Sequence, residues 1–160
     1  MNFLQKISTT KLVLIIATFL TLTGNAKFFS ETAIIYSWSD NTLFLISLFF
    51  WLFSFLAILL LLVSYRYSVK PILVLLLLIS SIVAYFANNY GIVIDDNMIA
   101  NSMETNMAES LDLFSLKLVL YFFVLGAIPS YWVYKVKITH LKFSQQLRSK
   151  LKAIIILTIV

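Results

Sequence analysis

The stretch that decides the fold is LFLISLFFWLFSFLAILLLLV, residues 43–63. It carries no charged residue, and only Ser47 and Ser54 interrupt its apolar character; their hydroxyls can donate back to the backbone of the same helix. About 20 helical residues cross a hydrocarbon core of roughly 30 Å. The stretch therefore predicts a membrane-spanning helix, which ends at the interfacial sequence Tyr65-Arg66-Tyr67.

Two more runs have the same character. Residues 72–90 follow after a tight turn over Arg66–Lys70, and Pro71 stands in the first helical turn, where a missing N–H costs little. We therefore expect residues 43–63 and 72–90 to be antiparallel spans. Residues 116–136 form the next span, and aromatic side chains typical of an interface rim it, namely Tyr131, Trp132 and Tyr134.

The first apolar run is less regular and has two interpretations. Residues 12–22 are apolar, and Gly24-Asn25-Ala26 then resembles the small-residue close of a cleaved signal peptide. Alternatively the apolar character continues beyond Lys27 and residues 12–35 form an uncleaved span. We favour the uncleaved span, since apolar residues resume after Lys27.

The final run, residues 153–160, would cover only about 12 Å as a helix. We interpret it as the start of a fifth span inside which the chain stops. The predicted fold is thus an all-α membrane domain over residues 1–160, with four full spans and part of a fifth.

Composition supports this class. The chain is 61% hydrophobic and 12% charged, with a mean hydropathy of +0.97, whereas roughly a quarter of the residues of soluble domains are charged. These values exclude a soluble globule. The chain has no cysteine and one histidine, which excludes a cysteine nucleophile and a cysteine-based metal site within these residues.

The charges separate between the two ends of the predicted spans. Ten of the twelve basic residues and no acidic residue fall on one side: Lys6, Lys11, Arg66, Lys70, Lys135, Lys137, Lys142, Arg148, Lys150 and Lys152. All seven acidic residues fall on the other: Glu31, Asp40, Asp95, Asp96, Glu104, Glu109 and Asp112. The basic side is predicted to be cytoplasmic, with the N-terminus, and residues 91–115 periplasmic. The net charge of +5 therefore gives no indication of a nucleic acid partner.

Residues 91–115 form the longest connection, and we expect an amphipathic helix over about 96–113. Ile99, Met103, Met107 and Leu111 recur at four-residue spacing, as do Asn101, Thr105 and Glu109. At about 100° per residue the two series lie on opposite faces of a helix.

The polar face of this helix has two interpretations. Its carboxylate can pair with an ammonium group, and its amide and hydroxyl can bind phosphate or carbonyl oxygens, which together make up a zwitterionic phospholipid headgroup. Alternatively, it is the solvated face that any surface helix presents, and spacing alone favours this second interpretation.

Several segments resemble one known family. They are residues 84–95 (AYFANNYGIVID), 98–101 (MIAN), 104–110 (ETNMAES) and the turn 64–71 (SYRYSVKP). Together they are similar to the N-terminal membrane domain of bacterial phosphoethanolamine transferases.

The resemblance implies an inner-membrane enzyme that moves phosphoethanolamine from phosphatidylethanolamine to lipid A or another envelope acceptor. In that family, five spans anchor a periplasmic hydrolase domain that holds a threonine nucleophile and zinc. The resemblance further implies that Asn101, Thr105 and Glu109 line the donor-lipid site. No nucleophile motif and no zinc-ligand set occurs in these 160 residues, so we expect the chain alone to hold no cofactor and to be inactive.

A different class is a non-enzymatic membrane module, such as part of a transporter or an assembly partner. Transport sites usually place ionisable groups or broken helices at mid-membrane. The middles of the spans at 43–63, 72–90 and 116–136 carry no charge, and Gly126 with Pro129 is the one clear irregularity in their sequences. This pattern favours the transferase interpretation.

Overall fold

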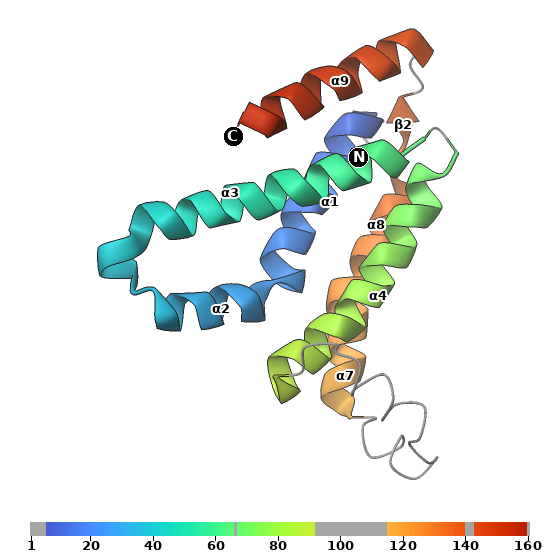
Figure 1. Cartoon of the computed structure of the whole chain (residues 1–160). Helices are drawn as coiled ribbons and strands as arrows, with labels where there is room; N and C mark the ends of the chain where they lie inside the picture. The colour runs from blue at the N-terminus through green and yellow to red at the C-terminus, as the bar shows by residue number, and fades with distance from the viewer. Residues whose placement is uncertain (1–5, 66, 92–114, 140–142, 160) are drawn as a thin grey trace, which may run out of the picture.

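The computed structural model describes residues 6–65, 67–91, 115–139 and 143–159. These residues are almost entirely helical (Figure 1). The elements in chain order are β1 (Ile7–Ser8), α1 (Thr9–Gly24), α2 (Ala26–Ile35), α3 (Trp38–Val63), α4 (Val69–Tyr90), α7 (Leu116–Tyr121), the π-helix η1 (Phe122–Ala127), α8 (Ile128–Lys135), β2 (Ile138–Thr139) and α9 (Phe143–Ile159).

Three of the predicted spans are confirmed as helices long and apolar enough to cross a membrane. They are Trp38–Val63, Val69–Asn89 and Leu116–Lys135, the last formed by α7, η1 and α8 together. The predicted amphipathic helix at 96–113 lies outside the described residues.

The first predicted span, residues 12–35, is not one straight helix. α1 and α2 together are long and apolar enough to span, but they are bent by 56° at Asn25. There the backbone leaves helical geometry, with φ −115° and ψ 18°, and the Asn25 side-chain amide donates to the carbonyl of Leu20 at 3.1 Å. This bond ties the Asn25 side chain back onto the last turns of α1 at the bend.

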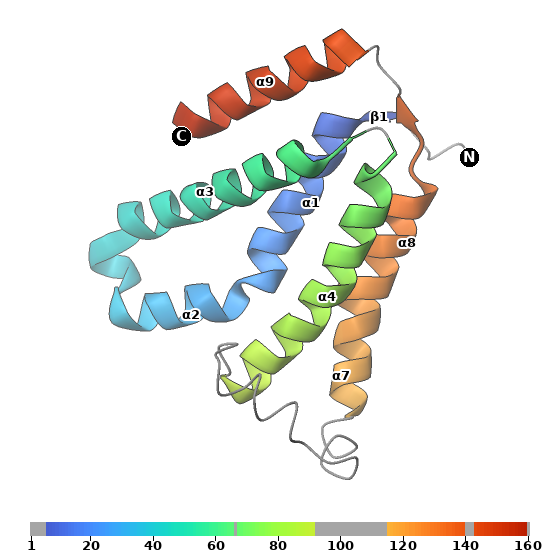
Figure 2. The same ribbon diagram turned by 45° about the vertical axis from the view of Figure 1, so that its right-hand side comes forward.

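α3 and α4 depart from the expected antiparallel pair. The two helices diverge with distance from the turn that joins them, and α3 packs on α1 and α9 instead of on α4 (Figures 1 and 2). The expected position of Pro71, in the first turn of α4, is confirmed. The expected back-bonding is confirmed for Ser47, which donates to the Phe44 carbonyl at 2.8 Å. It is wrong for Ser54, whose buried hydroxyl has no hydrogen-bond partner among the described residues.

α9 begins at Phe143, well before the predicted start at residue 153. Its first ten residues include Arg148, Lys150 and Lys152, so hydropathy alone places them outside an apolar run. One face of this part of α9 is buried against α3 and α1, and the opposite face stays exposed.

The span at 116–136 contains a π-helix rather than a simple kink. A proline ring clashes with the carbonyl four residues earlier and offers no N–H to it, and Pro129 therefore disrupts the α-helical pattern at Leu125. The wider turns of η1, over Phe122–Ala127, take up this mismatch directly before Pro129.

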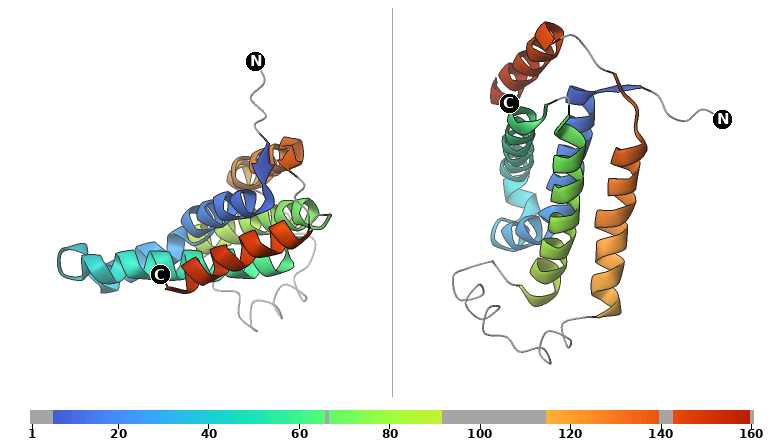
Figure 3. Two further views of the ribbon diagram at one scale, coloured as in Figure 1. Left: turned by 90° about the horizontal axis from the view of Figure 1, so that it is seen from above. Right: turned by 90° about the vertical axis from the view of Figure 1, so that its right-hand side faces the viewer.

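A short β-pairing joins the start of the chain to the segment after α8. Ile7 pairs with Ile138 and Ser8 with Thr139 in parallel register, a feature that the all-α prediction did not include. We call the end of the molecule where this pairing lies the basic end, and the opposite end, where α4 stops and α7 starts, the Gly91 end (Figure 3).

A core of aliphatic side chains holds the helices together. Its largest fully buried members include Leu12 and Ile16 of α1, Leu61 of α3 and Leu73 and Leu77 of α4. Large apolar side chains on the outward surfaces stay exposed, with Trp51 63% exposed. An apolar exterior around an apolar core is the pattern of a helical protein surrounded by lipid.

Candidate lipid-binding site

A groove at the Gly91 end lies between the α1–α2 corner, α4 and the α7–η1 helix. Its volume is about 460 Å³, within the range of about 300–1,000 Å³ typical of small-ligand pockets. The lining is mostly apolar, and the residues are Leu22, Thr23, Ala26, Asn88, Leu120, Tyr121, Val124 and Leu125.

Three half-buried polar side chains accompany this apolar lining. Thr23 lies in the last turn of α1 and donates its hydroxyl hydrogen to the carbonyl of Phe19 at 2.8 Å, so its oxygen can still accept a hydrogen bond. Asn88 lies in the last turn of α4 and Tyr121 at the end of α7. An apolar trough with an amide and two hydroxyls along it suits an amphiphile.

Tyr85 fixes the geometry of this end. Its ring is 2% exposed, and its hydroxyl lies 2.6 Å from the Ser115 hydroxyl. Ser115 is also the N-cap of α7, accepting from the Leu118 N–H at 3.1 Å. The Tyr85 ring meets Tyr121 edge to face, with 5.6 Å between centroids. These contacts hold the end of α4 beside the start of α7. Residues 92–114 lie between these two helix ends in the sequence.

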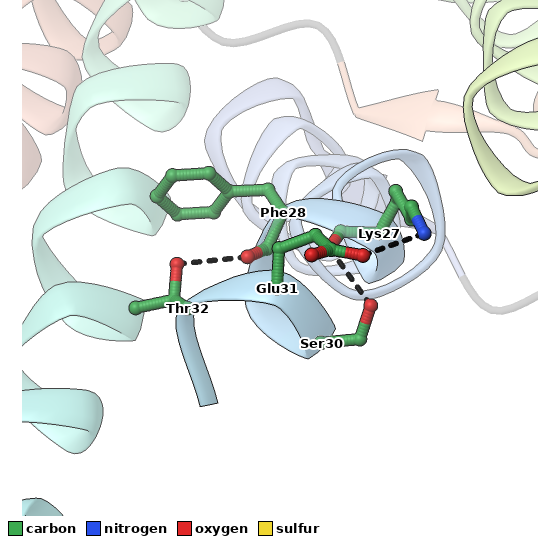
Figure 4. A network of polar contacts seen from close by, with 5 residues as sticks. All are labelled: Lys27, Phe28, Ser30, Glu31 and Thr32. Carbon is green, nitrogen blue, oxygen red and sulfur yellow. Dashed lines mark hydrogen bonds and ion pairs between the residues drawn. The ribbon is translucent and has the colours of Figure 1, made fainter. Parts of the chain in front are cut away.

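The surface of α2 next to the groove carries one ion pair. Lys27 lies 2.6 Å from Glu31 (Figure 4), and none of the described α2 side chains is buried. An exposed pair of this kind contributes about 0–1 kcal/mol. The nearby hydroxyls donate to the α2 backbone, Ser30 to Lys27 and Thr32 to Phe28, each at 2.8 Å.

The residues predicted to bind the donor lipid, Asn101, Thr105 and Glu109, lie outside the described residues. The structure places the two positions that flank their segment, Gly91 and Ser115, at the groove end of the molecule. Gly91 ends α4 in the left-handed region, with φ 66°, a conformation that favours glycine.

Sequence reasoning missed Thr23 and Tyr121 as candidate groove residues. Each lies near the end of an apolar run, where a hydroxyl is an ordinary interfacial feature. One signal was the helix break at Asn25, because such a break brings the end of α1 and the start of α2 to the same corner of the fold. Only the packing of three separate segments shows that these side chains share a groove.

The described residues offer no metal centre: no group of three or more His, Asp or Glu side chains lies close enough among them to hold an ion. These residues do not fit a zinc site. We therefore assign no step of a reaction to a metal in this part of the chain.

Comparison with known proteins now identifies the family. The family model described as phosphoethanolamine transferase EptA/EptB matches residues 52–160. The chain belongs to this family.

Individual relatives agree with this assignment. The chain is 36% identical over 152 residues to the phosphatidylethanolamine transferase Mcr-1 of Escherichia coli, covering 94% of this chain and 28% of that protein. It is 37% identical over 126 residues to Mcr-2 of Escherichia coli, covering 79% of this chain and 23% of that protein. The chain thus spans about a quarter of the length of these relatives.

A solved structure shows the same fold. The integral membrane protein lipooligosaccharide phosphoethanolamine transferase A from Neisseria meningitidis matches with a TM-score of 0.85 at 21% identity, over 96% of this chain and 29% of that chain. The family match includes Asn88 and Tyr121 of the groove and begins after Thr23. The groove therefore combines a wall within the matched region with a wall from α1 and α2.

Proposed function

We propose that this chain is the membrane domain of a phosphoethanolamine transferase of the bacterial inner membrane, and that it anchors the enzyme and binds the donor lipid phosphatidylethanolamine. The phosphoethanolamine group is passed to lipid A or another envelope acceptor. Family membership supports the reaction class, and the names of the Escherichia coli relatives support the donor.

The groove at the Gly91 end is the observation that carries donor binding. Its apolar lining suits an acyl chain, and its polar side chains suit the ester region of the lipid. The apolar residues are Leu22, Ala26, Leu120, Val124 and Leu125, and the polar ones are Thr23, Asn88 and Tyr121. The groove lies near the end of the molecule where α4 and α7 are tied by Tyr85 and Ser115. On this proposal the segment between them contributes the headgroup contacts.

Each proposed headgroup residue has a distinct role. Glu109 pairs with the ammonium of the ethanolamine, and Asn101 and Thr105 donate hydrogen bonds to phosphate oxygens. The nucleophile and the zinc belong, on this proposal, to a periplasmic catalytic domain outside these residues. The 160-residue chain by itself then binds the donor without turning it over.

The test is binding of a fluorescent phosphatidylethanolamine to the purified chain in nanodiscs. We expect Glu109→Gln to weaken binding about tenfold, since a hydrogen bond to a charged group contributes about 1.5–3 kcal/mol. Glu104→Gln, the same change on a carboxylate outside the proposed site, is the control. Turnover of the labelled donor by this chain alone would overturn the division of roles.

A second pair of variants tests the groove itself. Val124→Trp fills a position that lines the groove, whereas Phe123→Trp changes its η1 neighbour, which does not line it. Val124 is 53% exposed and Phe123 55%, so the two sites are matched. We expect only Val124→Trp to reduce binding. Equal binding in all four variants would favour the non-enzymatic membrane module with an inert polar face.

A further inference from the structure

A second pocket, at the basic end, gathers four lysines. Its volume is about 570 Å³, and its lining residues are Lys6, Tyr67, Lys70, Lys135, Val136, Lys137 and Ile138. The pocket is separate from the groove at the Gly91 end, with which it shares no lining residue.

The fold brings these lysines together from three parts of the sequence. The β1–β2 pairing includes a bond from the Ile7 N–H to the Lys137 carbonyl at 3.0 Å, which sets Lys6 beside the segment after α8. Lys70, in the first turn of α4, donates to the Tyr134 carbonyl at 2.7 Å. Lys135, in the last turn of α8, lies 5.4 Å from the centre of the Tyr131 ring.

No acidic side chain lines this pocket, so the lysine charges are not balanced by the described residues around it. The two acids that the structure describes, Glu31 in α2 and Asp40 in the first turn of α3, belong to other parts of the fold. The Tyr134 carbonyl at the C-terminal end of α8 accepts a hydrogen bond from Lys70 but carries no full negative charge, so the pocket keeps its excess of positive charge. Mutual repulsion of this kind favours a bound anion.

Aromatic side chains show where the pocket lies relative to lipid. Tyr67, Tyr131 and Tyr134 are 84%, 64% and 69% exposed around it, and exposed tyrosines beside apolar helix surface mark the headgroup level of a bilayer. Val136 and Ile138 add apolar lining beside the lysines. The anion that reaches such a pocket most directly is a lipid headgroup in the adjoining leaflet.

We propose that the pocket lined by Lys6, Lys70, Lys135 and Lys137 binds the phosphate of an anionic phospholipid, as a site distinct from the donor-lipid groove. The ammonium groups bind the phosphate oxygens, and the half-buried Ile138 contacts the start of the acyl chains. Net negative charge selects this lipid over phosphatidylethanolamine, whose ammonium group would face four lysines.

The experiment measures lipid retained by the whole chain. Protein is reconstituted in vesicles of phosphatidylcholine with either cardiolipin or phosphatidylethanolamine, extracted in mild detergent, and its bound lipids are counted by native mass spectrometry. We expect Lys6→Gln/Lys137→Gln to lower the number of cardiolipin molecules retained and to leave unchanged the number of phosphatidylethanolamine molecules, which bind at the donor groove on the proposed function. Lys6→Gln/Lys137→Gln should weaken cardiolipin retention about thirtyfold, since two lysines near the surface together contribute about 2 kcal/mol. Neither side chain forms a hydrogen bond or ion pair with the other described residues.

The matched control is Lys11→Gln/Lys152→Gln, which removes two exposed charges from the basic side without touching the pocket lining. It should leave retention within twofold of the original chain. An equal loss in the two double variants would show general attraction to a basic surface and overturn the proposal. Displacement of cardiolipin by millimolar inorganic phosphate would assign the pocket to free phosphate and overturn the lipid assignment.

Discussion

At the scale of single residues, two glycines let helices come close to α4. A Cβ added at Gly24 would lie 2.8 Å from the Ser80 hydroxyl, and one added at Gly126 would lie 2.6 Å from the Ser81 hydroxyl. Small residues at such contacts are how membrane helices gain packing in the absence of a hydrophobic driving force between them. Gly126 thereby fixes η1, and with it the Tyr121–Leu125 wall of the groove, against α4.

Gly126→Ala should destabilise the fold by about 1–3 kcal/mol, because the new methyl group overpacks the contact with Ser81. Unfolding in mixed micelles with rising SDS measures this change. Adding Ser81→Ala should recover part of the loss, since the closest atom is the Ser81 oxygen, while Ser81→Ala alone removes only a bond to the Leu78 carbonyl of its own helix. Independent, additive effects of the two substitutions would contradict the proposed contact.

At the scale of elements, Lys150 fastens α9 to the end of α3. Its side chain is 8% exposed; Nζ donates to the Leu61 carbonyl at 2.8 Å and to the Ser64 carbonyl, and lies 4.7 Å from the Tyr65 ring centre. The last carbonyls of a helix lack helical donors, so the lysine satisfies groups that burial would otherwise leave unpaired. Burial lowers the pKa of Lys150 below its ordinary value.

The pH dependence of Lys150→Met follows from this pKa. Between the lowered folded pKa and the unfolded value of 10.5, the unfolded chain holds more protons, so stability from this group rises with pH. The neutral amine keeps two N–H donors for two carbonyls, whereas Met has none, and unpaired buried carbonyls cost about 1–3 kcal/mol each. The deficit of Lys150→Met should therefore widen as pH rises through this window.

Unfolding titrations from pH 7 to 10.5 measure that deficit. Lys152→Met removes the same charge from an exposed neighbour and should show no such widening. A deficit for Lys150→Met that shrinks with rising pH would show that the charged form is the stabilising one.

The sequence predicts some elements better than others, for a physical reason. Residues 43–63 and 72–90 are apolar on all sides, so lipid alone determines that they are helical. The start of α9 and the bend at Asn25 depend on contacts with other helices, which hydropathy does not report. Lys150 illustrates this: in the sequence it is one more cytoplasmic charge, and in the fold it is a buried donor.

At the scale of the whole molecule, the candidate site was predictable only in part. Four-residue spacing predicts that Asn101, Thr105 and Glu109 share one face of a helix, but spacing within one segment gives no information about what that face would contact. The groove joins Thr23, Asn88 and Tyr121 across α1, α4 and α7, and no local pattern connects these positions. The function was predicted from the family resemblance, because that resemblance compares several segments of the chain together rather than one local pattern.

The orientation of the molecule is the remaining whole-molecule prediction, and the absence of native cysteine makes it directly measurable. Lys117→Cys introduces an exposed thiol at the Gly91 end and Lys137→Cys one at the basic end. Since lysines concentrate in cytoplasmic connections, a membrane-impermeant maleimide should label Lys117→Cys in intact spheroplasts and Lys137→Cys only after permeabilisation.

Phe123→Cys, on the apolar surface of η1, should stay unlabelled in either state because lipid covers it. The reverse labelling of the two lysine positions would show that the basic end faces the periplasm, and it would remove the proposed donor groove from the side where the family's catalytic domain is expected.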